Sequence, residues 1–194
     1  MKTVSILITG VGGQGTLLAS RILGNLALKL NLDVKVSEVH GMAQRGGSVV
    51  TYVRMGEEVH SPVIDPGCAD VLLSFEGLEA LRSAHMVKDG GSIVVNDQAI
   101  NPMPVVTGAV EYPADVMERM QAMPVTLVVV DALTLAEKAG NARTVNTALM
   151  GALARRMEVP VETWLEAIAD CVPPKTIEIN KTAFLLGYEA AKGE

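Results

Sequence analysis

Residues 4–15, with the sequence VSILITGVGGQG, decide the fold of this chain. The run from Val4 to Thr9 is apolar and rich in β-branched residues, which is typical of a buried strand. A GxGxxG loop, residues 10–15, follows at once, and a helical pattern of apolar residues opens at Thr16. A strand, a glycine loop and a helix in this order predict the first unit of a Rossmann-like, doubly wound α/β fold.

The glycine loop has the composition of an anion-binding site. Gly10 suits a tight turn, Gly12 lets backbone N–H groups approach an anion, and Gly15 lets helix and strand pack closely. The helix N-terminus adds unpaired N–H donors and a partial positive charge. Packing does not require Gly13 or Gln14, so we expect an exposed loop that contacts something. The alternative is a turn whose glycines serve close packing alone.

The remaining apolar pattern predicts a mostly parallel sheet. We expect the first helix to end near Leu30 and residues 34–39 to form the second strand of a right-handed β-α-β unit. Residues 48–64 alternate in polarity around Gly56, which predicts an inserted β-hairpin. Further strands are expected at 71–75, 93–96 and 125–130, helices at 77–87 and 114–123, and a loop with a short strand at 102–112.

From Asp131 onward the sequence predicts helices. Apolar residues recur at helical spacing from Val145, from Pro160 and from Ile177. No repeat, low-complexity tract or linker interrupts the chain. We therefore expect a single domain over residues 1–194, in which an α/β sheet core (1–130) carries a C-terminal helical block (131–194).

Composition excludes several classes of protein. The net charge of −6 and the aromatic content of 3% argue against a nucleic-acid partner. Two distant cysteines, Cys68 and Cys171, cannot ligate an iron–sulfur cluster by themselves. No signal-like or membrane-spanning run is present, so we expect a cytoplasmic protein without a membrane partner. An apolar content of 49% predicts a surface that faces a partner subunit, or a second copy in a homodimer when the chain is isolated.

A second stretch, residues 37–48 (SEVHGMAQRGGS), has no architectural explanation. It begins at the carboxyl end of the second predicted strand, beside the glycine loop, where open α/β sheets bind ligands. His40, Gln44 and Arg45 stand among its glycines. Each of them alone is compatible with a packed or solvated side chain in a bend, but the whole stretch predicts a recognition site.

Together the two stretches resemble the gamma domain of the 2-oxoacid:ferredoxin oxidoreductases. The wider family more often has an acidic residue before Arg-Gly-Gly, whereas HGMAQRGG at residues 40–47 is similar to the indolepyruvate branch. The expected hairpin and the closing residues 180–188 (NKTAFLLGY) fit the same small subunit. The resemblance therefore covers nearly the whole chain.

The resemblance implies an oxidoreductase subunit that is not active alone. Members of the family convert a 2-oxoacid and coenzyme A into acyl-CoA and carbon dioxide, and they pass electrons to ferredoxin. Thiamine diphosphate and iron–sulfur clusters carry out these steps. This chain has no thiamine motif and no clustered cysteines. We therefore expect those cofactors on a large partner subunit, and ferredoxin to be reached through the complex.

The same reasoning names candidate site residues. Arg45 would pair with a substrate carboxylate or a coenzyme A phosphate, Gln44 would hydrogen-bond beside it, and His40 would share a proton or orient a group. None of them makes a complete catalytic site. The glycine loop would bind coenzyme A, another anion or only the partner. We expect no metal site on this chain.

Two alternatives stay open. Glu38 lies about twenty residues beyond the glycine loop, where a dinucleotide-binding fold places its ribose-binding acid. This favours a stand-alone NAD-dependent oxidoreductase, although no Tyr-x-x-x-Lys pair accompanies the loop. The other alternative is a subunit that only scaffolds or regulates. Which 2-oxoacid is used stays undetermined, because the partner would form most of the pocket.

Overall fold

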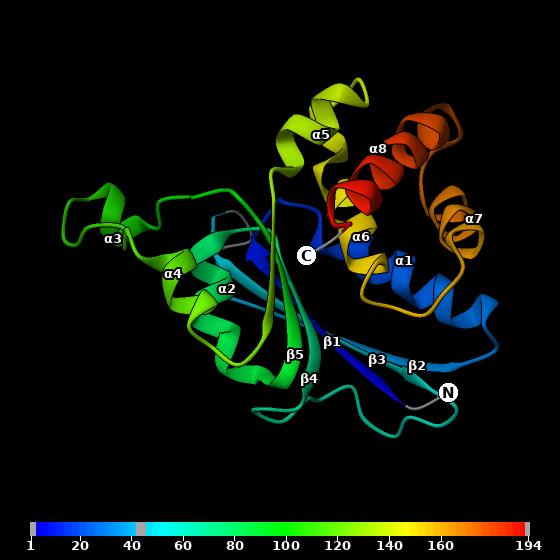
Figure 1. Cartoon of the computed structure of the whole chain (residues 1–194), viewed down its shortest axis with the longest axis horizontal. Coiled ribbons are helices and arrows are strands. Elements are labelled where there is room, and N and C mark those ends of the chain that lie inside the picture. The colour runs from blue at the N-terminus through cyan, green and yellow to red at the C-terminus, as the bar shows by residue number, and fades with distance from the viewer. Residues whose placement is uncertain (1–2, 42–45, 193–194) are drawn as a thin grey trace.

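The computed structural model describes residues 3–41 and 46–192 (Figure 1). The strands are β1 (Val4–Val11), β2 (Asp33–His40), β3 (Ser48–Gly56), β4 (Ala69–Ser74), β5 (Val87–Asn96) and β6 (Thr126–Val130). Within the described residues they form one sheet in the order β2-β3-β1-β4-β5-β6. The β1–β4, β4–β5 and β5–β6 pairs are parallel, as expected for a mostly parallel sheet.

Helices cover both faces of the sheet, which confirms the doubly wound α/β fold (Figure 1). One face carries α1 (Thr16–Lys29), α5 (Ala132–Lys138), α6 (Val145–Ala154), α7 (Val161–Cys171) and α8 (Ile177–Ala190). The other face carries α2 (Gly77–Ser83) and α4 (Val116–Gln121). The short helix α3 (Met103–Val106) follows β5, and 3₁₀ turns occupy residues 84–86, 142–144 and 174–176. Each face therefore has its own apolar core.

The position of β3 corrects the predicted hairpin. β3 lies between β1 and β2 and is antiparallel to both, so β1 and β2 are parallel but not adjacent. The hairpin consists of β2 and β3, joined by residues 41–47, and not of two strands within 48–64. Residues after Gly56 leave the sheet, and the Arg54 guanidinium donates to the carbonyl oxygens of Ser61 and Val63. Alternating polarity identified β3 but could not identify its neighbour.

The expected short strand within residues 102–112 is wrong, because this segment contains α3. Pro102 precedes the helix and Pro104 lies in its first turn, where a missing N–H costs no hydrogen bond. The segment also lies beyond the end of β5 and has no neighbouring strand with which to pair.

The C-terminal helices pack on the α1 face through close helix contacts. Gly151 of α6 and Gly187 of α8 lie where the two helices touch, and a Cβ on Gly187 would overlap the carbonyl of Ala148. Buried Asn180, which interrupts the apolar stripe of α8, accepts a hydrogen bond from Thr147 Oγ1 at 2.7 Å. The polar interruption in the sequence is thus a buried hydrogen bond between α8 and α6.

Candidate functional site

The glycine loop joins β1 to α1 at the carboxyl edge of the sheet. Gly13 and Gly15 have φ values of 106° and 94°, which favour glycine. Gly10 lies inside β1 and does not form the predicted tight turn. Its small size makes room for neighbours instead, because a Cβ there would lie 2.9 Å from Gln14 Oε1 and 3.1 Å from the Phe75 Cβ.

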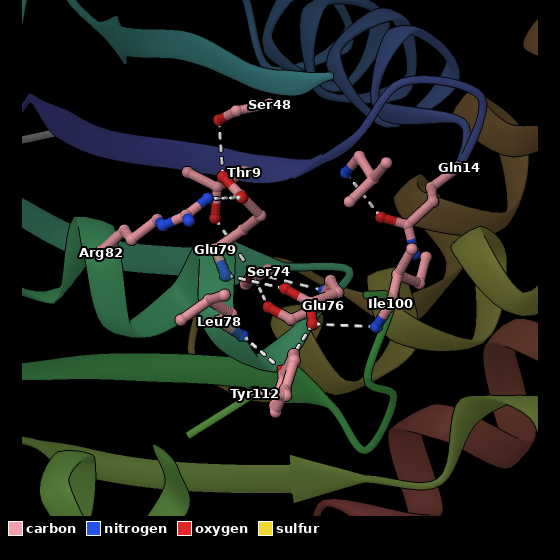
Figure 2. A network of polar contacts seen from close by, with 11 residues as sticks. Thr9, Gln14, Ser48, Ser74, Glu76, Leu78, Glu79, Arg82, Ile100 and Tyr112 are labelled. Atoms are coloured by element: carbon pink, nitrogen blue, oxygen red, sulfur yellow. Dashed lines mark hydrogen bonds and ion pairs between the residues drawn. The ribbon is translucent and has the colours of Figure 1, made fainter. Parts of the chain in front are cut away.

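Gln14 holds the loop against the ends of three strands. Its Oε1 accepts from the Val11 N–H at 2.7 Å, and its Nε2 donates to the Phe75 carbonyl at 2.9 Å and to Gln98 Oε1 at 3.1 Å (Figure 2 shows the folded-back side chain). The residues after β1, β4 and β5 are thereby linked. Gln14 therefore has a structural role, and it also lines a cavity; its contact with a ligand stays a prediction.

The two motif stretches meet through their backbones. The Gly12 N–H donates to the Gly47 carbonyl at 2.8 Å, so this amide does not point at an anion as expected. The first turn of α1 supplies the remaining donors. Among the described residues no side chain caps this helix and its first turn holds no acidic residue, which leaves the partial positive charge of its N-terminus uncompensated.

A cavity of about 280 Å³ lies between the glycine loop and the β2–β3 hairpin, and Gly13, Glu38 and His40 contribute to its lining. Glu38 Oε2 accepts from Thr51 Oγ1 at 3.2 Å across the hairpin. His40 is exposed, with its Nδ1 3.0 Å from the Gly41 carbonyl oxygen. Gln44 and Arg45 lie outside the described residues, and the structure therefore does not locate their side chains.

A larger cavity of about 540 Å³ lies on the other side of the glycine loop. It opens where β1 and β4 are neighbours and their helices leave toward opposite faces, which is the switch point at which open α/β sheets bind ligands. Gln98, Arg143 and Asn146 line it together with the glycine loop. The exposed Arg143 adds a positive charge beside the α1 N-terminus. No local sequence pattern marks Arg143 as a site residue, because it lies far along the chain from the glycine loop.

Two buried glutamates form a polar network on the α2 side of this edge (Figure 2). Glu76 is 1% exposed; its Oε2 accepts from the Glu79 N–H at 2.8 Å, and its Oε1 accepts from the Ile100 N–H at 3.1 Å and the Tyr112 hydroxyl at 2.6 Å. Partial burial, and secondarily the hydrogen bond to Glu76, raise the pKa of the Tyr112 phenol above its ordinary value. Glu76 thus joins α2 to both ends of the α3 segment.

Glu79 connects the same network to the second stretch. Its Oε2 accepts from Ser48 Oγ at 2.5 Å and its Oε1 pairs with Arg82 Nη1 at 2.6 Å. Ser48 is the last residue of the stretch and the first of β3, so Glu79 anchors the point at which the stretch re-enters the sheet. A sequence signal for this network exists, because Glu76 and Glu79 follow β4 and are spaced three residues apart, as on one face of a helix.

The described residues hold no group of three or more His, Cys, Asp or Glu side chains that could bind a metal ion. Within the same described ranges, no helix has both the length and the apolar character needed to cross a membrane.

Comparison with known proteins decides the family. Residues 5–190 match the family described as pyruvate ferredoxin/flavodoxin oxidoreductase. The chain belongs to this family. It is 46% identical over 99% of its length to indolepyruvate oxidoreductase subunit IorB of Thermococcus kodakarensis, of which the match covers 98%. It is 27% identical over 96% of its length to the common subunit gamma of the Pyrococcus furiosus pyruvate/ketoisovalerate oxidoreductases, also covering 96% of that subunit.

Solved structures show the same fold at lower identity. The gamma subunit of a keto/oxoacid ferredoxin oxidoreductase from Geobacter sulfurreducens matches with a TM-score of 0.74 and 22% identity over 98% of this chain and 99% of that chain. A 2-oxoglutarate:ferredoxin oxidoreductase chain from Magnetococcus marinus matches with a TM-score of 0.74 and 20% identity; the match covers all of this chain and 32% of the longer one. The solved structures confirm the fold, and the family match with the 46% identical relative confirms the prediction of a 2-oxoacid:ferredoxin oxidoreductase subunit.

The dinucleotide alternative loses support from the topology. Insertion of β3 moves β2, and with it Glu38, about 4.8 Å farther from the glycine loop than in a sheet where the first two strands are neighbours. The Glu38 carboxylate also accepts a hydrogen bond from Thr51. The greater separation and the existing hydrogen bond weigh against a ribose-binding role for Glu38, although Glu38 lines the cavity beside Gly13.

Proposed function

We propose that this chain is the small subunit of an oxidoreductase for indolepyruvate or a related arylpyruvate, and that its carboxyl edge closes an active site supplied by a large partner subunit. The hydrogen bond between Gly12 and Gly47 carries the proposal, because it brings the glycine loop and the stretch at 37–48 to one edge. The similarity to relatives named indolepyruvate oxidoreductase subunit IorB, at 35–46% identity, supports the choice of substrate class.

The cofactors of the reaction belong to the partner in this proposal. Thiamine diphosphate would supply the carbanion chemistry and iron–sulfur clusters would carry electrons to ferredoxin. Two distant cysteines are too few to ligate a cluster on this chain, which supports the assignment. The residues of this chain bind and orient the substrates, and they exclude water from the shared active site.

The larger cavity is the proposed site for the phosphate end of coenzyme A. An anion there would meet the uncapped N-terminus of α1 and the Arg143 guanidinium, both of which favour negative charge. Arg45 and Gln44, on the second stretch, would approach the carboxylate of the 2-oxoacid at the junction with the partner. His40 would orient the same group from the end of β2.

The test is reconstitution with the large subunit from the same organism. Reduction of ferredoxin that depends on arylpyruvate and coenzyme A should require both chains. Arg143→Ala should raise the KM for coenzyme A at least tenfold and leave the KM for the 2-oxoacid unchanged. Arg45→Ala should show the opposite pattern if the substrate carboxylate is its ligand.

Arg119→Ala is the matched control, since Arg119 is an exposed arginine on α4, on the opposite face. If Arg143→Ala and Arg119→Ala changed the KM for coenzyme A equally, coenzyme A would not bind in the larger cavity as proposed. Full activity of the large subunit alone, or tight NAD binding by this chain alone, would overturn the proposed function.

A further inference from the structure

Residues 101–111, here called the arm, stand away from the rest of the chain around α3 (Figure 1). Nine of these eleven residues are exposed, including Met103 (68%), Val106 (64%) and Val110 (57%). The sequence contains no charged residue from Gln98 to Val110. Within the arm only its last residue, Glu111, is charged. An exposed segment with so many apolar and so few charged residues is typical of a contact surface.

The arm is folded by its own backbone. After α3, Gly108 takes a left-handed conformation with φ 75°, its N–H donates to the Val105 carbonyl at 3.0 Å, and the Ala109 N–H donates to the Pro104 carbonyl at 2.9 Å. This pair of bonds is the Schellman motif that ends a helix. The exposed apolar side chains therefore project from an ordered unit whose backbone hydrogen bonds are already made.

Both ends of the arm are held by one buried carboxylate. Glu76 Oε1 accepts from the Ile100 N–H just before the arm and from the Tyr112 hydroxyl just after it, and the Leu78 N–H donates to the same hydroxyl at 3.1 Å. Figure 2 shows the contacts from Ile100 and from Tyr112 converging on Glu76. A projection fixed at its base loses little conformational entropy on binding, which is the advantage of preorganisation.

The arm is continuous with the candidate site. Ile100, at its base, lines the larger cavity, and Tyr112 lines a neighbouring cavity of about 160 Å³. Other exposed large apolar side chains lie near the carboxyl ends of strands: Val39 is within the last two residues of β2, and Leu17 and Leu133 follow β1 and β6. A partner that covers the mouth of the larger cavity would therefore meet the arm as part of the same surface.

The size of the arm favours the large partner subunit over a second copy of this chain as its binding partner. A stable pair of proteins buries about 800 Å² on each side, with roughly 20–30 residues from each partner. Two arms packed on each other, with three large apolar side chains apiece, fall well below that.

We propose that the arm is a preformed docking element that inserts into an apolar recess of the large partner subunit beside the shared active site. This inference rests on the proposed function. The main interface covers the carboxyl edge, and the arm fixes its register by placing Met103, Val106 and Val110 in the recess.

The test measures the affinity of separately purified small-subunit variants for the large subunit. Val106→Asp places a charge at the tip, and it should weaken binding at least tenfold because the carboxylate would lose its water in an apolar recess. Val106→Leu should bind within about twofold of the unmodified chain. Val63→Asp is the matched control, with a valine of 58% exposure on the loop after β3, and it should leave the affinity unchanged.

The unfolding midpoint of each isolated variant shows whether it has folded. Unchanged affinity of Val106→Asp, or equal loss with Val63→Asp, would overturn the docking role alone. The docking role would also be overturned if the unmodified chain formed a dimer, and Val106→Asp abolished that dimer but kept the affinity for the large subunit. The arm would then bind a second copy of this chain. Failure of the unmodified chain to bind the large subunit would overturn the proposed function and the docking role together.

Discussion

Two regions of the molecule, the α6–α8 contact and the arm, place glycine and apolar residues in opposite surroundings. At the helix contact, Gly151 and Gly187 bring two backbones together and leave no room for a Cβ. In the arm, a Cβ on Gly108 would meet nothing within 4 Å, and the valines beside it face solvent. The chain uses its apolar surface for stability in the first region and leaves it available in the second.

This difference explains the apolar excess of the composition. The buried residues of both cores account for stability without the arm, since its exposed side chains belong to neither core. Substitutions in the two regions should therefore separate folding from association, with the largest effects on folding at the helix contact and the smallest at the arm.

The largest effect is expected for Gly187→Ala. The new methyl group would overlap the Ala148 carbonyl, so α6 and α8 must move apart, and we expect a loss of about 3 kcal/mol or more in the free energy of unfolding measured with urea. Gly24→Ala is the control within α1, where a Cβ meets nothing within 4 Å, and it should raise stability by up to about 1 kcal/mol. Equal effects of both variants would refute the close-packing role.

The next effect is expected for Glu76→Ala, because the Glu76 carboxylate holds both ends of the arm. It leaves the Ile100 and Glu79 amides and the Tyr112 hydroxyl without their acceptor, and we expect a loss of about 2–3 kcal/mol. Hydrogen exchange should accelerate at Ile100 and through the arm, while amides of α6 keep their relative protection. Uniform acceleration over the whole chain would show that Glu76 does not hold the arm specifically.

Tyr112→Phe should have a smaller effect of about 1 kcal/mol at neutral pH. The folded state raises the pKa of this phenol above its ordinary value of 10.0. The unfolded chain therefore loses the proton first, so the contribution of Tyr112 is complete below pH 10 and declines as the pH rises above it. The difference in stability between wild type and Tyr112→Phe should shrink from pH 9 to pH 11; a constant difference would contradict this.

The smallest effect is expected for Val106→Asp in the isolated chain. Its side chain belongs to neither core, so the free energy of unfolding should change by less than about 0.5 kcal/mol. Calorimetry of the isolated chain measures this. If Val106→Asp lowered the free energy of unfolding as much as Glu76→Ala does, the arm would be part of the folded core. The arm and the α6–α8 contact would then not differ in their role in stability.

Local signals explain what the sequence could predict. The apolar run ending at Gly10 and the helical pattern from Thr16 predicted β1 and α1 within one or two residues, because strand, loop and helix each have their own short-range pattern. The meeting of the two motif stretches followed from the rule that carboxyl ends of parallel strands share one edge. Gly12 and Gly47 are hydrogen-bonded at that edge.

Long-range partners explain what the sequence could not predict. Nothing near β3 indicates that it inserts between β1 and β2, because alternation reports burial and not the neighbouring strand. Arg143 enters the larger cavity from a turn beyond β6, and Glu76 meets Tyr112 across more than thirty residues. The arm was misjudged as a loop with a strand because valines favour strands wherever a neighbour exists, and here none does.

The insertion of β3 also affects synthesis of the chain. Among the described residues β1 pairs with residues 48–55 and 71–74, both far downstream, so the first strand to be translated lacks these hydrogen-bond partners until β3 and β4 have been made. At about 5–20 residues per second, that interval lasts several seconds. The nascent chain therefore passes through a stage in which an unpaired strand is exposed, and assembly of the sheet begins when β2 and β3 close as a hairpin onto it.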